Sequence, residues 1–278
     1  MPFKSILSVT GPGLSDRDLK LAEGLCEDAG AHLSVLVVRM AAPPPLGELA
    51  AVAPEVWLQE RQEDERALAM RRDEITALLS PSPVSADVTT DYPDLSWSDE
   101  TIGRRGRYAD LTLVGPDVLG TQTLKGKVIE GALFWSGKPM LLVPEGASAT
   151  LRPRRVLVAW DARIEASRAV REALELLAAA DEVRLVLVDP VAGEKAHGAE
   201  PGADIAAYLA RHGIKVVVDR VPSEGHPVAD VLRRRAMDFD AEMLVMGAYG
   251  HSRFRERLLG GVTRSMLDEV PLPLFMAR

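Results

Sequence analysis

One pattern of short apolar runs occurs twice in this 278-residue chain, and the repeat restricts the possible folds more than any other feature. The runs at 6–9 (ILSV) and 33–38 (LSVLVV) align with those at 156–159 (VLVA) and 183–188 (VRLVLV) after a shift of 150 residues, without a gap. Self-similarity over such a distance is typical of a duplicated domain. The sequence therefore predicts the same architecture in each half.

The later part of each half repeats as well. The segment 109–115 (ADLTLVG) matches 241–247 (AEMLVMG). The stretch at 145–153 is polar and contains Gly and Pro, which is typical of a linker. We therefore predict one domain at 1–146 and a second at 152–278.

Strands alternate with helices in both halves. The strands are apolar almost throughout, as expected of a parallel sheet buried on both faces and joined by helical crossovers. In the second half we expect strands at about 155–160, 183–188, 214–220, 242–247 and 273–277, and helices at 166–179, 201–212, 228–239 and 263–269. The first half adds a charge-rich helix at 55–79 after its second strand. The predicted fold class is α/β, with two tandem open sheets of five parallel strands.

Composition excludes several classes of protein. The formal net charge of −8 disfavours general binding to nucleic acid or to an anionic membrane. The single cysteine, Cys26, cannot form an internal disulfide, and we expect it to be buried and inert. The sequence shows neither a signal-peptide pattern nor an apolar run long enough to span a bilayer. We expect a cytoplasmic protein.

Four glycines surround a basic loop after the strand at 242–247. Gly247 and Gly250 lie before this loop, and Gly260 and Gly261 follow it. In parallel sheets ligands bind beyond the carboxyl ends of the strands, where glycine allows the backbone to approach a ligand closely. The second pair precedes a predicted helix that begins near Thr263, where N–H groups can bind phosphate. The alternative is that these glycines serve only in turns and helix caps.

This spacing resembles the G-x2-G-x9-G-[ST] signature of the universal stress protein family. The strand at 156–159, followed by Trp160 and Asp161, is similar to the first strand of that family, which ends in an aspartate. The resemblance covers both halves and implies tandem Rossmann-like domains of the adenine nucleotide alpha hydrolase-like type. It also implies that ATP binds across the strand ends of the second domain.

Residue by residue, the resemblance implies a cofactor site made of two strand ends and the glycine loop. Its members are Ala159, Trp160, Asp161, Leu187, Met246, Gly247, Gly250, His251, Ser252, Arg253, Gly260, Gly261, Val262 and Thr263. Gly261 stands where the family has Ser or Thr, and the missing hydroxyl contact is expected to weaken ATP binding by at most about tenfold. Trp160 either covers the edge of the pocket or packs beneath a helix.

The first half lacks most of this pattern. Gly11 stands where the second half has Asp161, and Gly115 matches Gly247. Gly126 aligns with Gly260 after a loop two residues shorter, and Lys127 replaces Gly261. Lys127 is expected to be either a solvated surface lysine or an anion contact. We expect the first domain to be structural or to bind a different ligand.

No residues form a catalytic or metal-binding constellation in the sequence. His251 and Ser252 are adjacent, which is a poor arrangement for a base and its nucleophile. Mg²⁺ could accompany ATP through phosphate oxygens and water. The leading hypothesis is a stress-response protein that binds ATP as a regulatory ligand, with a protein partner not yet known. The alternatives are an adaptor that binds no nucleotide and a slow ATPase.

The last predicted strand of each half needs a partner. The strands at 140–143 and 274–277 would otherwise leave open sheet edges, which favour aggregation. Members of the family that this chain resembles often pair these strands between subunits. We therefore expect the two strands to pair within one chain as an internal pseudo-dimer. Two chains could associate further through the helix at 55–79.

Overall fold

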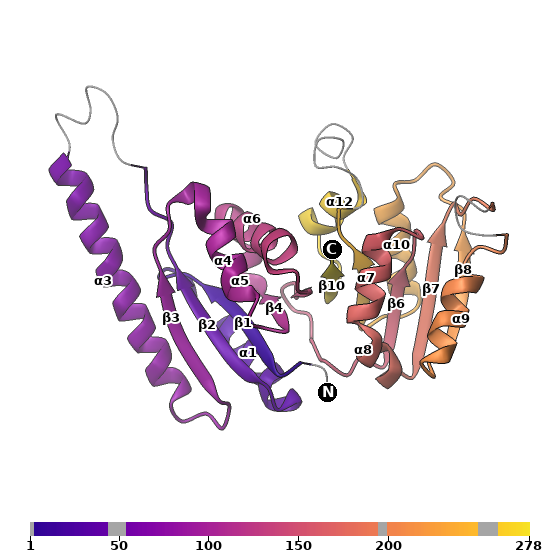
Figure 1. Ribbon diagram of the computed structural model, residues 1–278, viewed down its shortest axis with the longest axis horizontal. Helices are drawn as coiled ribbons and strands as arrows, with labels where there is room; N and C mark the ends of the chain where they lie inside the picture. Colours follow the sequence, from indigo (N-terminus) through magenta and orange to yellow (C-terminus); the bar gives the residue numbers. More distant parts are fainter. Residues whose placement is uncertain (1–2, 44–53, 194–198, 250–260) are drawn as a thin grey trace. The chain divides into compact units, whose positions relative to one another are not determined.

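The computed structural model describes residues 3–43, 54–193, 199–249 and 261–278 (Figure 1). Contacts between residues divide the chain into two compact units, Phe3–Lys138 and Pro139–Arg278. Both are mixed α/β units with mostly parallel strands, which confirms the predicted fold class.

The first unit is built on four parallel strands. They lie in the order β3-β2-β1-β4. The strands are β1 (Ser5–Thr10), β2 (His32–Val38), β3 (Ala86–Asp91) and β4 (Leu111–Val114). The helices are α1 (Arg17–Ala29), α3 (Pro54–Leu79), η1 (Leu95–Trp97), α4 (Ser98–Gly106), α5 (Pro116–Leu119), α6 (Gln122–Glu130) and the π-helix η2 (Gly131–Ser136). The predicted long helix is α3, which lies along β3 and β2 (Figure 1).

The described part of the second unit contains six strands, in the order β5-β10-β9-β6-β7-β8, rather than the predicted five. They are β5 (Met140–Leu142), β6 (Arg155–Ala159), β7 (Glu182–Val188), β8 (Val216–Val221), β9 (Met243–Gly247) and β10 (Leu274–Ala277). All pair in parallel except β5 and β10, which are antiparallel. The described helices are α7 (Ile164–Glu172), α8 (Leu174–Ala179), α9 (Ala203–Arg211), α10 (Val228–Asp238) and α12 (Val262–Asp268).

The predicted strands and helices of the second half are confirmed, with one difference. The helix expected at 166–179 is two helices, α7 and α8, which meet at Ala173. Ala173 has φ −92° and ψ 0°, outside the usual helical values, and its side chain is fully buried. Helical periodicity continues across such a break, so the sequence pattern does not reveal it.

The predicted pairing of the two terminal strands is confirmed. Leu274 pairs with Leu142, Phe275 with Leu141 and Met276 with Met140. These contacts place β5 in the compact unit that begins at Pro139, although the sequence repeat assigns this strand to the first half. All six paired side chains are fully buried, which explains why both strands are apolar throughout.

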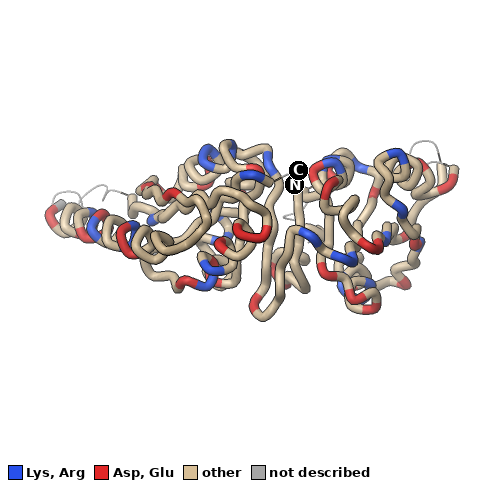
Figure 2. Tube along the Cα trace, turned by 90° about the horizontal axis from the view of Figure 1, so that it is seen from below, with Lys and Arg blue, Asp and Glu red and all other residues tan. Residues whose placement is uncertain are grey.

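Two further features bear on the classes of protein considered above. No described helix is both long and apolar enough to cross a membrane. Basic and acidic residues are interspersed along the chain trace of each unit (Figure 2).

Candidate functional site

The candidate site lies where the strand order of the second unit changes direction. Strand β6 pairs with β9 on one side, where Val158 lies opposite Val245, and with β7 on the other, where Ala159 lies opposite Val186. The carboxyl ends of these three strands therefore lie side by side. Parallel α/β sheets bind ligands beyond such a switch point.

Asp161 is an exposed carboxylate just beyond β6, with half of its side-chain surface accessible (53%). Its Oδ1 atom accepts a hydrogen bond from the backbone N–H of Arg163 at 3.1 Å, and Oδ2 lies 3.6 Å from the guanidinium of the same residue. The preceding residue, Trp160, is half-buried and donates its backbone N–H to the Val186 carbonyl at 2.9 Å. Asp161 is thus available to an external hydrogen-bond donor while its turn is fixed by the neighbouring strand.

Gly247 is needed for packing rather than for ligand approach. A Cβ atom at this position would lie 2.4 Å from the Ala166 nitrogen and 2.5 Å from the Glu165 carbonyl carbon. Both contacts are with backbone atoms in the first turn of α7, and displacing this backbone would cost free energy. The glycine therefore lets α7 begin directly against the end of β9.

A hydrogen bond joins the two described ends of the glycine loop. The backbone N–H of Tyr249 donates to the hydroxyl of Thr263 at 3.0 Å. Thr263 is buried (4% exposed) in the first turn of α12, whose N-cap is Gly261 and whose first residue is Val262. Thr263 was predicted to be part of the ligand site. Its oxygen already accepts this hydrogen bond, which joins the residues before and after the loop, while its hydroxyl hydrogen can still be donated to a ligand.

Leu187 and Met246 reach the same edge of the sheet, but their side chains are buried. Leu187 is fully inaccessible and Met246 is 5% exposed. The Leu187 Cδ1 atom would be 3.2 Å from a Cβ placed on Gly202, so this side chain packs near the start of α9. The buried side chains of Leu187 and Met246 therefore do not face a purine, contrary to the prediction.

Five described residues other than glycine have positive φ, and four of them, including Glu224 (52°), follow strand ends at this edge of the second unit, whereas Asp240 (49°) precedes β9 at the opposite edge. Ala162, Asp189 and Tyr249 have φ values of 60°, 46° and 56°, and they follow the ends of β6, β7 and β9 respectively. Left-handed conformations of residues other than glycine are costly and occur often at functional sites. Among the described residues of the first unit, only glycines have positive φ.

The centre of the predicted loop lies outside the described residues. Gly250, His251, Ser252, Arg253 and Gly260 all belong to this segment. Their predicted contacts with a ligand stay predictions. In the described part of the chain no group of His, Cys, Asp and Glu has the arrangement of a metal site.

The sequence prediction missed one carboxylate at this edge. Asp189 follows β7 directly and is exposed. Its Oδ1 accepts the backbone N–H of Ser223 at 2.9 Å, and hydrogen bonds from Ser223 hold the pKa of Asp189 below its usual value. Asp161 was assigned from the resemblance to the family's first strand, and Asp189 could have been found from its position directly after the apolar run at 183–188.

The corresponding position in the first unit is filled by one of its own side chains. The Asp18 carboxylate is buried (2% exposed) and accepts the backbone N–H groups of Asp117 and Val118 at 2.8 and 3.0 Å. A Cβ on Gly115 would lie 2.4 Å from this carboxylate. Burial raises the pKa of Asp18 above its usual value, and the two backbone hydrogen bonds offset part of that rise. A carboxylate of the chain itself thus binds the N–H groups that follow β4.

The alignment of Lys127 with Gly261 is wrong, because Lys127 lies inside α6 whereas Gly261 is the N-cap of α12. Gly126 also lies inside α6, with nothing within 4 Å of a Cβ added there, and Gly260, with which it was aligned, lies outside the described residues. Lys127 is not a solvated surface lysine: its Nζ lies in a partly buried position and forms an ion pair with the Asp99 carboxylate at 2.9 Å, so its anionic partner belongs to the chain itself. Helix α5 begins directly after Gly115. The residues that follow it therefore do not align with those that follow Gly247 in the second half.

Comparisons with known proteins agree with this description. Residues 153–278 match the model of the Universal stress protein family. A universal stress protein of known structure from Archaeoglobus fulgidus DSM 4304 aligns over 98% of this chain and 96% of its own, with a TM-score of 0.67 and 20% identity. A putative universal stress protein from Pseudomonas aeruginosa UCBPP-PA14 aligns over 99% of this chain and 93% of its own, with a TM-score of 0.56 and 16% identity. No curated protein matches the chain. The two structures share the fold of the whole chain.

Proposed function

We propose that residues 153–278, which match the model of the Universal stress protein family, bind ATP as a regulatory ligand rather than as a substrate. The observation that carries the proposal is the strained backbone at three neighbouring strand ends, where Ala162, Asp189 and Tyr249 have positive φ. Strain of this kind persists only where the surrounding structure enforces it, and it often prepares a binding site.

The available side chains and backbone groups fit an adenine nucleotide. Asp161 is exposed beside Trp160 and can accept a hydrogen bond from a ribose hydroxyl or an exocyclic amine. The backbone N–H groups near Gly261 and the hydroxyl of Thr263 are donors of the kind that phosphate oxygens accept. The sequence positions of Gly250 and Gly260, which match the glycine signature, support a phosphate loop between these two regions. Mg²⁺ would be held by phosphate oxygens and water.

The first unit is proposed not to bind nucleotide. Its Asp18 carboxylate already accepts the N–H groups of Asp117 and Val118, and it carries the same sign of charge as phosphate. Gly11, which replaces Asp161, offers no carboxylate to a base or ribose. We therefore expect one ATP per chain. We further propose a cytoplasmic location and a role in the response to stress.

Calorimetric titration of ATP into the full chain tests this proposal. We expect a stoichiometry near one and a loss of about 1–3 kcal/mol in binding free energy for Asp161→Ala, because a polar group of the nucleotide loses its partner. Asp181→Ala is a matched control, because Asp181 is also exposed and paired with an arginine but precedes β7, at the other end of the strands. Its affinity for ATP should equal that of the unchanged chain.

Three outcomes would count against the proposal. A stoichiometry near two would show that the first unit also binds nucleotide. Equal losses from Asp161→Ala and Asp181→Ala would place the site elsewhere. Absence of ATP binding, together with no adenine nucleotide detected by mass spectrometry after denaturing the purified protein, would favour an adaptor that binds no nucleotide.

A further inference from the structure

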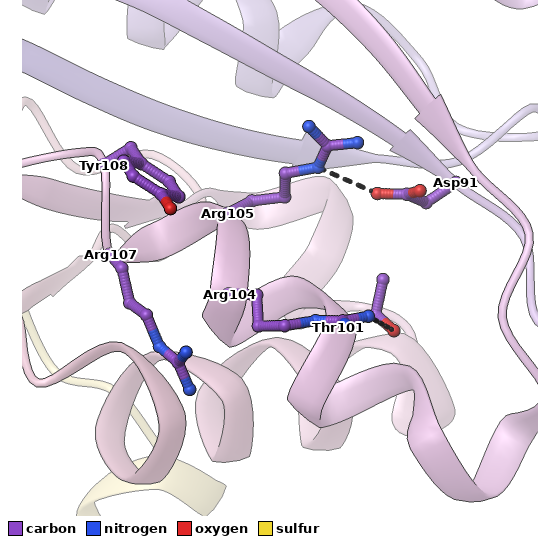
Figure 3. A pocket seen from close by; sticks show the side chains of 6 residues that line it. All are labelled: Asp91, Thr101, Arg104, Arg105, Arg107 and Tyr108. Carbon is purple, nitrogen blue, oxygen red and sulfur yellow. Dashed lines mark hydrogen bonds and ion pairs between the residues drawn. The ribbon is translucent and has the colours of Figure 1, made fainter.

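A second pocket lies in the first unit, remote in sequence from the proposed ATP site. It has a volume of about 260 Å³ and is lined by Asp91, Thr101, Arg104, Arg105, Arg107 and Tyr108 (Figure 3). Three guanidinium groups and one carboxylate leave this pocket with an excess of two positive charges. The chain as a whole carries a formal net charge of −8, so the charge of the pocket has the opposite sign to the net charge of the chain.

The local sequence explains why the arginines face outward. In the segment 103–108 (GRRGRY), Gly103 and Gly106 are buried and the other four residues are exposed. A Cβ on Gly103 would lie 2.2 Å from Trp135 Cβ, and one on Gly106 would lie 2.9 Å from Ser136 Cβ. The two glycines therefore hold the end of α4 tightly against η2. This packing fixes the backbone from which the arginines project.

Only one of the three arginines has an acidic partner among the described residues. Arg105 pairs with Asp91, with its Nε 2.9 Å from Oδ2. Arg104 donates only to the Thr101 hydroxyl, at a long 3.3 Å, and does not pair with Glu100 one turn earlier. Arg107 donates through Nε to the Trp135 carbonyl at 2.8 Å. Two cations are thus bound to neutral oxygens only.

The end of a helix attracts basic residues, but that effect does not account for the whole cluster. Arg104 and Arg105 lie in the last turn of α4, where they favour the negative end of the helix dipole. Arg107 lies beyond the last helical residue, and the ring of Tyr108 is 87% exposed. An exposed aromatic side chain beside unpaired cations indicates a ligand surface more than a helix cap.

We propose that this pocket binds the phosphate groups of a small oligophosphate-bearing molecule. Guanidinium groups form paired, charge-assisted hydrogen bonds with phosphate oxygens, and these would replace the weaker contacts of Arg104 and Arg107 with neutral oxygens. Figure 3 shows the guanidinium groups pointing in different directions, so Arg104 and Arg107 turn about their side-chain bonds on binding. The volume is at the lower limit of ordinary ligand pockets, about 300 Å³, and suits a few phosphate groups rather than a whole nucleotide.

Titration with tripolyphosphate, followed by calorimetry on the full chain, tests the proposal. We expect Arg104→Gln and Arg107→Gln each to weaken one binding event by about tenfold or more, the usual loss for a hydrogen bond to a charged group. Arg66→Gln and Arg211→Gln are matched controls, because the first removes an exposed cation from α3 and the second an exposed cation from the last turn of α9. Both controls should bind tripolyphosphate within about twofold of the unchanged chain, since long-range charge effects are screened by salt.

Arg104→Gln is the decisive variant, because within the described part of the chain the one hydrogen bond it removes is the long bond to Thr101. Its thermal unfolding midpoint should match that of the unchanged chain, so that a weaker affinity cannot be ascribed to misfolding. Unaltered tripolyphosphate affinity in Arg104→Gln and Arg107→Gln would overturn the proposal. Equal weakening in all four variants would also overturn it, since only general charge attraction would then act. ATP binding by the second unit should be unchanged in Arg104→Gln. The proposed phosphate pocket and the proposed ATP site are therefore tested independently of each other.

Discussion

At the scale of single residues, two glycines that look alike in the sequence have opposite roles. Gly247 ends a strand where any Cβ would collide with the backbone of α7, whereas Gly126 lies in the middle of α6 with open space around it. Gly247→Ala should lower the free energy of unfolding by about 1–3 kcal/mol, because a tightly packed contact must be displaced. Gly126→Ala should raise it by about 0.5–1 kcal/mol, since alanine favours a helix interior. Urea unfolding of both variants measures these changes, and the same sign for both would contradict the assigned roles.

At the scale of secondary-structure elements, one carboxylate joins three helices of the first unit. Asp99 on α4 forms an ion pair with Lys127 of α6 at 2.9 Å and accepts the indole N–H of Trp135 in η2 at 3.1 Å. Burial raises the pKa of Asp99, but hydrogen bonds from Lys127, the backbone and Trp135 prevail, so the pKa lies below its usual 3.8. The folded state therefore favours the ionised carboxylate.

This depressed pKa predicts a dependence of stability on pH. The contribution of Asp99 is fully present above the unfolded-state pKa near 3.8 and is lost as the pH falls through the lower folded-state pKa. At pH 6, Asp99→Asn should reduce the free energy of unfolding by about 1.5–3 kcal/mol, and the difference from the unchanged chain should shrink below pH 3.8. Asp28→Asn removes an exposed carboxylate of α1 and should change little at either pH. A difference for Asp99→Asn that stays constant with pH would show that the ion pair does not contribute.

At the scale of the whole molecule, strand β5 completes the sheet of the unit that follows it. It covers β10, whose four residues are at most 3% exposed. A fragment spanning 152–278 lacks β5 and leaves the backbone of β10 without this partner, which invites pairing between chains. We expect that fragment to dimerise or aggregate more strongly than a fragment spanning 139–278, in which β10 keeps β5 as its partner, as measured by light scattering after size-exclusion chromatography. Monomers of equal stability from both fragments would show that β5 is dispensable.

The sequence determined those features that depend on local pattern. Apolar runs and helical periodicity predicted the strands and helices of the second half, and the repeat predicted the α/β architecture. The resemblance to the universal stress protein family implied that residues flanking β6 and β9 share one site, and the pairing of Val158 with Val245 shows that these two strands are neighbours.

Only the tertiary structure decided which groups are paired across long stretches of chain. Asp18 reaches the backbone of Asp117, 99 residues away, and the pairing of Lys127 with Asp99 spans 28 residues. The role of Gly247 likewise depends on α7, which lies far from it in sequence. A local pattern records whether a residue prefers a strand, a helix or burial, but it carries no information about the partner that packing brings to it. The sequence therefore predicted the elements of this protein and the edge that they share. Only three-dimensional packing determined that the Asp18 carboxylate binds the backbone N–H groups after β4 in the first unit. It also determined that residues with positive φ follow the corresponding strand ends in the second unit.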